Sequence, residues 1–370
     1  MPEKVEKGGG RFIRHYSLKE EHDAYDPDSE DEEALHEHYT LTAPNGLVSV
    51  RVDKFLVNTL PQTSRSRLKN ASTTGAISVN GQSVKVSYKV KPGDVVRLML
   101  PFPPVPVIEA EPIPLDIRYE DQTLLIVYKP ASMVVHPAIG HRTGTLVQGL
   151  MYYLQNLPKG SGTQEDPRPG LIHRIDKETT GILVIAKTEY AMAHLSKQFF
   201  DRTTDRLYEA LVWGDVKEEE GRIEAHIGRN VKNRKIFQAF PDGSTGRSAV
   251  THYRVLERFG VATLVQCKLE TGRTHQIRVH MKHIGHPLMG DYDYGGDRIV
   301  VGPNHQRYQQ MMTNCLGLLP GQALHAKTLS LTHPDTGERM DFSADMPENL
   351  AAILEKLRRW RDGRDASVEW

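Results

Sequence analysis

The sequence predicts two folded units in one chain: a small module of helices and a β-hairpin, then a larger α+β domain with a mixed, largely antiparallel β-sheet and flanking helices. Three observations predict this arrangement. The chain has 370 residues, about twice the ~150 residues of a usual domain. A proline-rich linker at residues 101–115 separates a basic segment from the rest. Beyond it, β-type and helical segments come in clusters instead of alternating, which favours an α+β fold.

The composition is typical of a globular protein, with 38% hydrophobic and 25% charged residues. The two cysteines, Cys267 and Cys315, lie far apart in the sequence and outside any CxxC spacing, which argues against a disulfide framework and a cysteine-rich zinc site. The most apolar runs, residues 123–128 and 181–186, are too short to span a bilayer. We therefore expect a cytoplasmic protein without a membrane segment.

Residues 1–45 form a predicted acidic, disordered N-terminal tail. They carry 12 acidic residues against 5 basic ones, so the zero formal net charge of the chain hides a basic remainder. Residues 26–33 have neither an apolar period nor aromatic content, which is typical of a solvated segment. A solubilising extension is the simpler interpretation of this tail, and an inhibitory mimic of nucleic-acid phosphate is the alternative.

Residues 49–100 form a basic module. Within it, residues 51–100 carry nine Lys or Arg against two Asp. Apolar residues at helical spacing predict a first helix over residues 51–60, and Ser64 is a good N-cap for a second helix. The second helix carries three cations on or beside one face, which suits a phosphate backbone: Arg65, Arg67 and Lys69.

A β-hairpin is expected after the two helices. Asn80-Gly81 is the strongest short hairpin signal, and it precedes a second strand through Val84 and Val86 and a third over residues 95–100. This order of two helices, a basic turn, a hairpin and a further strand resembles the S4 RNA-binding domain. The resemblance implies that the module binds RNA.

The larger domain is predicted over residues 116–350, with a C-terminal helix and tail over residues 351–370. Helical periodicity is present at residues 191–200, 276–283 and 348–360. The β-type segments are residues 123–128, 181–187, 206–213, 249–256 and 262–269. The chain has no GxGxxG or GxxxxGK[ST] motif, so phosphoryl and hydride transfer lack their usual nucleotide cradle.

The segment with the most chemical content is residues 170–187, where an ionisable loop precedes a strongly apolar strand. Asp176 lies in that loop between Arg174 and Lys177, so we expect it at the edge of the core. Partial desolvation and neighbouring cations would govern its charge there, which suits a carboxylate nucleophile. By the residue pattern alone, a structural salt bridge or a turn cap is the more common role of such an aspartate.

The same segment resembles the signature of the RluA-type family of pseudouridine synthases, written HRLD-K-x-T-S/T-G-L. Further motifs of that family have counterparts in the right order, at residues 128–137, 206–210, 269–280, 286–291 and 323–326. The departures are small, with Ile175 in place of the commoner Leu and Met289 in place of Val or Ile. The S4-like module precedes these motifs as it does in the D-type synthases of large-subunit ribosomal RNA.

The resemblance implies a chemistry that needs no cofactor. Pseudouridine formation breaks the bond from ribose C1′ to uracil N1, turns the base and rejoins it through C5. By resemblance, Asp176 is the catalytic carboxylate, acting by covalent attack or by removing a ribose proton, and Arg278 keeps it ionised. Tyr208 would stack on the uracil and relay the C5 proton. Arg174 would fill the stack left by the flipped nucleotide.

Other interpretations stay open for several of these residues. Tyr208 could be a core residue, and Arg278 could be an ion-pair partner on the sheet surface. Lys129 and Arg273 are further candidates for contacts with RNA phosphate. Four histidines invite a metal interpretation, namely His275, His280, His283 and His286. No carboxylate or thiol completes a zinc pattern beside them, so we expect no metal.

The sequence therefore predicts a monomeric pseudouridine synthase that isomerises specific uridines in large-subunit (23S) ribosomal RNA, free or in a pre-ribosomal particle. A transfer RNA pseudouridine synthase of the same family is one alternative. A noncatalytic RNA-binding ribosome-assembly factor is the other, and the intact Asp176, Tyr208 and Arg278 argue against it. The modified positions depend on RNA shape and single-stranded loops, which a protein sequence does not reveal.

Overall fold

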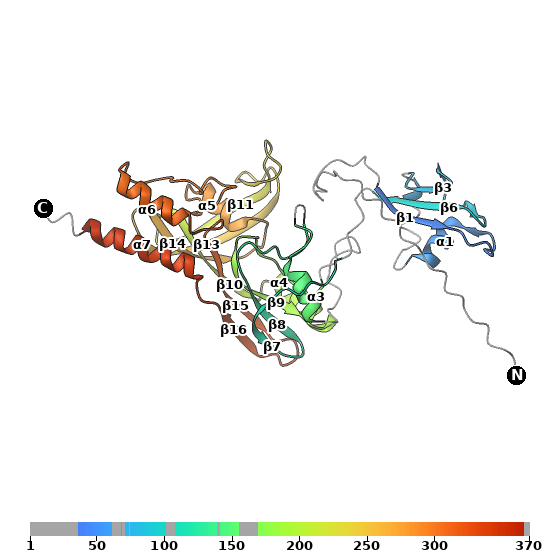
Figure 1. Ribbon diagram of the computed structural model, residues 1–370, viewed down its shortest axis with the longest axis horizontal. Helices are drawn as coiled ribbons and strands as arrows, with labels where there is room; N and C mark the ends of the chain where they lie inside the picture. Colours follow the sequence, from blue (N-terminus) through green and yellow to red (C-terminus); the bar gives the residue numbers. More distant parts are fainter. Residues whose placement is uncertain are drawn as a thin grey trace. The chain divides into compact units, whose positions relative to one another are not determined.

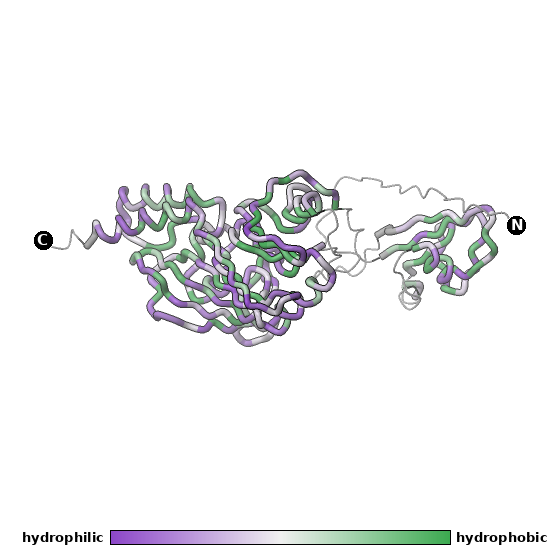
Figure 2. Tube along the Cα trace, turned by 90° about the horizontal axis from the view of Figure 1, so that it is seen from below, coloured by the Kyte–Doolittle hydropathy of each residue, from purple (hydrophilic) through white to green (hydrophobic). Residues whose placement is uncertain are grey.

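The structure is a computed structural model that describes residues 36–60, 68, 71–73, 75–100, 108–138, 141–154 and 169–365. The chain divides into two compact units, Met1–Val107 and Ile108–Trp370. In each unit the apolar segments gather in the interior (Figure 2). No helix in the described part of the chain is long and apolar enough to cross a membrane.

The smaller unit combines short β-strands with a helix (Figure 1). Its four-stranded sheet has the order β1-β6-β3-β4, formed by β1 (His36–Thr42), β6 (Val95–Leu100), β3 (Ile77–Val79) and β4 (Gln82–Ser83). The strand β2 (Val50–Arg51) pairs with β5 (Lys89–Val90) and leads into α1 (Val52–Thr59). The predicted first helix is confirmed as α1, which buries Val52, Phe55 and Leu56 in the core of the unit.

The predicted hairpin turn lies at Asn80-Gly81. Both residues have left-handed backbone angles, with φ of 50° and 81°, as a tight hairpin turn between right-twisted strands requires. The prediction of a strand through Val84 and Val86 was wrong, because β4 ends at Ser83. The Val84 N–H still bonds to Ile77, but a turn closed by a bond from the N–H of Tyr88 to Lys85 then diverts the chain.

The predicted tail over residues 1–45 was too long at its C-terminal end. The strand β1 (His36–Thr42) pairs antiparallel with β6, and Tyr39 and Leu41 pack against the core of the smaller unit. Because Tyr39 and Leu41 alternate with polar residues along β1, both side chains lie on the face of the strand that packs on the core. Residues 26–33, the most acidic part of the predicted tail, lie outside the described residues.

The larger unit is built on a ten-stranded sheet with the path β12-β11-β13-β14-β10-β15-β9-β8-β7, and β16 pairs with β15. Its first strands are β7 (Asp116–Glu120), β8 (Leu124–Lys129), β9 (Thr180–Ala186), β10 (Asp205–Trp213) and β11 (Glu220–Arg229). The others are β12 (Phe237–Phe240), β13 (Arg247–Arg258), β14 (Ala262–Leu269), β15 (Leu324–Thr332) and β16 (Arg339–Ser343). Between the strands of this sheet, β9 and β15 pair in parallel and the other pairs are antiparallel, which confirms the predicted fold class.

Helices flank this sheet as predicted. They are α3 (Leu146–Tyr153), α4 (Glu189–Asp201), α5 (Gln276–His283), α6 (Gln306–Leu316) and α7 (Glu348–Asp365). Two of them, α6 and α7, share one apolar cluster with β10 and β14 and lie near each other in Figure 1. The α4 helix packs on β9 and β15, and α5 packs beside β11, β12 and β13.

The boundaries of the larger unit differ from the prediction at both ends. Ile108 and Leu115 pack against its main apolar cluster, so residues 108–115 belong to this unit and not to a linker. The helix α7 places Leu350, Ile353, Leu354 and Leu357 in the apolar cluster that it shares with α6, so it is part of the unit and not a separate C-terminal segment. In both cases local composition did not show which apolar side chains the sheet would bury.

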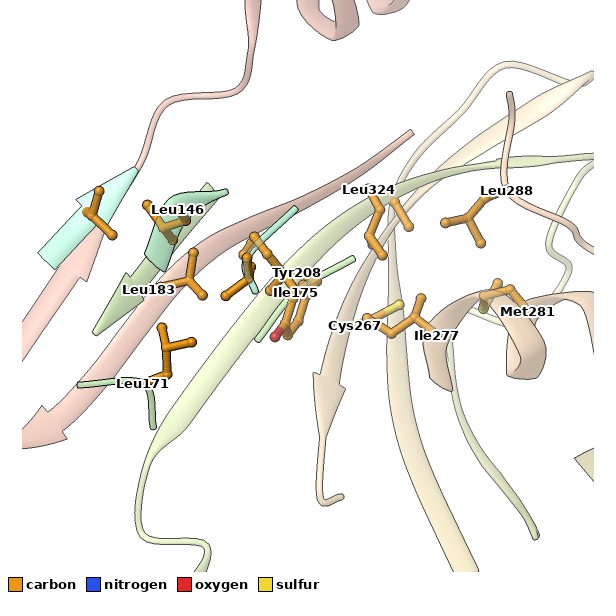
Figure 3. Close-up of a cluster of buried hydrophobic side chains, with 14 of the residues drawn as sticks. Leu146, Leu171, Ile175, Leu183, Tyr208, Cys267, Ile277, Met281, Leu288 and Leu324 are labelled. Carbon is orange, nitrogen blue, oxygen red and sulfur yellow. The ribbon is translucent and has the colours of Figure 1, made fainter. Parts of the chain in front are cut away.

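The main apolar cluster lies directly under the loop that carries Asp176. Figure 3 labels Ile175 and Tyr208 in this cluster, together with Ile277 of α5 and Leu324 of β15. Ile175 is the neighbour of Asp176 in the chain, and its buried side chain anchors the loop to the sheet. The packing of Ile175 in the core therefore positions Asp176 at the boundary between the core and solvent.

Candidate active site

The loop before β9 holds Asp176 at the mouth of a cavity. Leu171 forms a β-bridge with Ile185, and the Nε2 atom of His173 accepts a hydrogen bond from the N–H of Val184 at 3.2 Å. The loop therefore runs along the free side of β9 and is tied to it by side chain as well as by backbone. This arrangement leaves the Asp176 side chain 19% exposed.

The cavity has a volume of about 540 Å³. It is lined by the Asp176 loop, the end of α4, the start of β10, the end of β14, the segment that leads into α5 with the first turn of α5, and the start of β15. The lining includes the predicted residues Arg174, Asp176, Tyr208, Arg273 and Arg278. The fold therefore gathers into one site residues that lie up to 104 positions apart in the sequence.

Arg278 is the buried cation of the site. Its Nη1 atom donates to Asp176 at 3.2 Å, while its Nε and Nη2 atoms donate to the two carboxylate oxygens of Asp291, each at 2.8 Å. A further bond from Nη2 reaches Asp293 at 2.6 Å. Arg278 is 3% exposed and Asp291 is fully buried, so the paired interaction fixes the plane of the guanidinium.

These contacts set the charge of Asp176. Burial raises the pKa of this carboxyl, but the guanidinium groups of Arg278 and Arg174, together with the charge that His275 carries when it is protonated, outweigh it and hold the pKa below its usual range. Burial also lowers the pKa of His275, so this imidazole is neutral at pH 7 and Arg278 is the buried cation that acts there. Asp176 is therefore ionised at neutral pH.

Tyr208 lies on β10 opposite Cys267 of β14 and Ala326 of β15. It is both a core residue and a residue of the cavity wall. Burial raises the pKa of its phenol, and the charge of Asp176 raises it further against the opposing effect of Arg206. The phenol is therefore neutral at pH 7, and it can present a π-face and an O–H group to a ligand.

Two predicted RNA contacts, Arg174 and Arg273, line the cavity. Arg174 is exposed beside Asp176 and adds to its stabilising charge. Arg273 donates from Nε to the carbonyl oxygen of Ser248 at 3.1 Å. Burial and the nearby Arg247 and Arg202 lower the pKa of Arg273, which shows how closely positive charges are gathered here.

Lys129 does not contact RNA phosphate, and this prediction was wrong. Its ammonium group is fully buried at the end of β8 and donates to the carbonyl oxygens of Pro130, Met133 and Lys177 at 2.6, 2.9 and 2.8 Å. The three acceptors use all the donors of an ammonium group. Lys129 instead ties residues 130–133 to the backbone next to Asp176.

Burial lowers the pKa of Lys129 to about 7, against the raising effects of Glu178 and Asp176. In the unfolded chain the pKa returns to about 10.4, so between these values the unfolded state binds one more proton. We therefore expect the unfolding free energy of the protein to rise by about 1.4 kcal/mol per pH unit above pH 7, relative to a Lys129→Met variant. Urea unfolding of both proteins at pH 7, 8 and 9 measures this difference, and parallel pH profiles would contradict it.

Three further predicted RNA contacts, Arg65, Arg67 and Lys69, lie outside the described residues. The histidines with metal-like spacing do not converge. His280 bonds to the hydroxyl of Thr251, and His286 bonds to the carbonyl oxygen of Trp213. No group of three or more His, Cys, Asp or Glu side chains in the described part of the chain is placed to hold a metal ion.

Sequence reasoning did not assign the partners that hold Arg278 in place. Asp291 and Asp293 follow α5 on a turn that begins at Gly290, and only the fold brings them onto the guanidinium. The one signal in the sequence was the pair of carboxylates at alternate positions soon after a basic helix. Arg206, His173 and Phe199 were also not predicted as site residues, although all three line the cavity.

Comparisons with known proteins identify the family of this chain. Residues 123–283 match the family model described as RNA pseudouridylate synthase, and residues 50–96 match the S4 domain. A Bacillus subtilis protein named YlyB, an uncharacterized RNA pseudouridine synthase, is 46% identical over 86% of this chain and 98% of its own. A Zymomonas mobilis protein named ribosomal large subunit pseudouridine synthase D is 40% identical over 87% and 97%. The structure of human RNA pseudouridylate synthase domain containing 1 aligns with a TM-score of 0.46 at 24% identity, over 67% of this chain and 96% of that one.

A catalytic unit with this motif order and an RNA-binding module before it define an enzyme that modifies RNA. The chain belongs to the RluA-type family of RNA pseudouridine synthases, with an N-terminal S4 domain. The resemblance seen in the sequence is thereby confirmed.

Proposed function

We propose that this enzyme isomerises specific uridines in large-subunit (23S) ribosomal RNA, with Asp176 as the catalytic carboxylate and without a cofactor. The observation that carries the catalytic part is the contact between Asp176 and the buried guanidinium of Arg278 at the mouth of the cavity. The ribosomal substrate is supported by relatives from Zymomonas mobilis and Neisseria meningitidis, each named ribosomal large subunit pseudouridine synthase D, and by the S4 domain.

The reaction begins when the target uridine leaves the RNA stack and enters the cavity. Extrusion of a base costs a few kcal/mol, and Arg174 at the exposed rim offsets part of this by occupying the vacated position. The uracil then lies against Tyr208, whose ring forms part of the cavity wall. Substrate binding therefore uses one exposed cation and one buried aromatic ring.

Asp176 acts on the ribose of the bound uridine, either at C1′ as a nucleophile or by removing a ribose proton. The C1′–N1 bond breaks and the freed uracil turns. A C1′–C5 bond then forms as the Asp176 oxygen leaves C1′ on the first route, or as Asp176 returns the proton to the ribose on the second. The proton lost from C5 is balanced by the proton gained at N1, and the phenol of Tyr208 relays the C5 proton. Since the product is an isomer of the substrate, the scheme requires no oxidant, reductant or group donor.

The test is position-resolved pseudouridine mapping on ribosomal and transfer RNA from cells with the wild-type protein, without it, or with Asp176→Asn. We expect one or a few large-subunit uridines to lose their modification in both the null and the variant cells. Loss at transfer RNA positions would replace the ribosomal substrate by the transfer RNA alternative. Modifications that persist with Asp176→Asn would show that another group performs the chemistry, and unchanged RNA in the null cells would support an assembly role.

We further propose that the enzyme acts as a cytoplasmic monomer. Its RNA substrate accounts for the basic module and for the cations around the cavity, and neither feature requires a second subunit. The acidic segment that precedes β1, residues 1–35, remains a proposed solubilising extension.

A further inference from the structure

Arg206 is a cation of the cavity wall that has no hydrogen-bond acceptor within the described part of the chain. It lies on β10 two residues before Tyr208 and is half-buried. Among the described residues, no hydrogen bond or ion pair reaches its guanidinium, and its Nε atom is buried without a partner. Arg278, by contrast, has carboxylate acceptors on all three of its nitrogens. A buried donor without a protein acceptor can donate to an oxygen of a ligand, so Arg206 is a candidate to bind one.

Phe199 holds this cation in place. The guanidinium carbon of Arg206 lies 4.9 Å from the centre of the Phe199 ring. The ring of His173 stacks on the same Phe199, with ring centres 4.7 Å apart. Both side chains therefore lie against one phenyl ring at the end of α4, and all three line the cavity that contains Asp176.

His173 supplies a second donor without an acceptor. Its Nε2 atom accepts from the N–H of Val184, so the proton of the neutral ring is on Nδ1. That Nδ1 atom is buried and has no partner in the described part of the chain. Burial and the charge of Arg206 lower the pKa of His173 to about 3, so the ring is a neutral Nδ1–H donor at neutral pH.

The charges of the cavity identify the kind of ligand that fits. Four arginines line it, and the one carboxylate in the lining is Asp176. Arg278 is neutralised by Asp291 and Asp293, which leaves three cations around the space where the substrate enters: Arg174, Arg206 and Arg273. A ligand that offers only acceptor oxygens and a negative charge fits Arg206, and an RNA phosphate has both properties.

We propose that Arg206 binds a backbone phosphate adjacent to the target uridine, and that the His173 Nδ1–H group donates to an oxygen of the same nucleotide. This inference rests on the proposed function and adds a phosphate subsite to it. The subsite holds the ribose beside Asp176 while the uracil is free to turn. Retention of the detached base then depends on Tyr208, and retention of the ribose depends on Arg206.

The test couples a change in the protein to a change in the RNA. Oligonucleotides that contain the mapped uridine are made with one neutral methylphosphonate linkage, placed in turn at each phosphate near the target. At one position we expect the methylphosphonate to lower kcat/KM of the wild type about 10–100-fold, as for a lost charged hydrogen bond. With unmodified RNA, we expect kcat/KM of Arg206→Gln to be lower than that of the wild type by a similar factor. The same methylphosphonate then lowers kcat/KM of this variant by less than about 2-fold.

Arg254→Gln is the matched control. Arg254 lies on β13, is 68% exposed and is outside the cavity lining, so its variant keeps the full methylphosphonate effect. If every methylphosphonate lowers kcat/KM of Arg206→Gln by the same factor as that of the wild type, Arg206 does not bind the phosphate. The proposed function is unaffected by that result. If the mapping finds no uridine whose modification depends on this protein, the proposed function itself fails.

Two substitutions separate the roles of His173. His173→Gln keeps an acceptor near the Nε2 position for Val184 but loses the Nδ1 donor, whereas His173→Asn keeps a donor near Nδ1 and loses that acceptor. We expect the Gln variant to have the higher Tm and the Asn variant to have the higher kcat/KM. A purely structural role for His173 would rank the two variants in the same order in both measurements.

Discussion

Asp176→Asn is expected to lower the rate of pseudouridine formation by about 10⁴-fold or more while leaving RNA binding almost unchanged. The amide has the shape of the carboxylate but cannot ionise, so it can neither attack C1′ nor remove a ribose proton. Arg278 retains its bonds to Asp291 and Asp293, so the surrounding structure does not lose its main support. Single-turnover conversion of the mapped RNA measures the rate, and a filter-binding titration measures the affinity.

Asp116→Asn is the control for this experiment. Asp116 lies on β7, pairs with Arg118 at the surface and is not part of the cavity lining, so its variant retains the wild-type rate. A rate for Asp176→Asn within about 10-fold of the wild type is inconsistent with loss of a nucleophile or base. In that case the carboxylate has a binding role only.

Arg278→Met is expected to lower the free energy of unfolding by about 3–5 kcal/mol and to remove measurable activity. The loss of stability follows from Asp291, which is fully buried and would keep a negative charge without its paired partner. The loss of activity follows from Asp176, whose pKa rises when the adjacent guanidinium is removed.

The double variant Arg278→Met with Asp291→Asn separates the two effects. Removing the buried charge together with its partner restores a large part of the stability, but activity stays absent because Asp176 still lacks its cation. Arg339→Met is the control for loss of an exposed pair, since Arg339 is 40% exposed beside Asp205 and its removal costs less than about 1 kcal/mol. A cost below 1 kcal/mol for Arg278→Met would show that the buried pair does not support the fold.

Much of the fold could be predicted from the sequence because its signals are local. The strands that became β8, β9, β10, β13 and β14 were visible as apolar β-type runs, and α4 and α5 as helical periods. Asn80-Gly81 specified a turn because both residues must adopt left-handed angles there. In the catalytic unit, the order of motifs identified the family before any contact was known, and the family match confirms it.

The sequence by itself determined the class of enzyme, the fold class and the loop that carries Asp176. Only the tertiary structure decided which charged groups are compensated, because that depends on neighbours far apart in the chain. Lys129 is saturated by three carbonyl groups, while Arg206 has no acceptor in the described residues, yet both are basic residues at strand positions and look alike in the sequence. Residue spacing specifies the face of an element on which a side chain lies, but the free energy of a charge is set by what the fold places within a few ångströms of it.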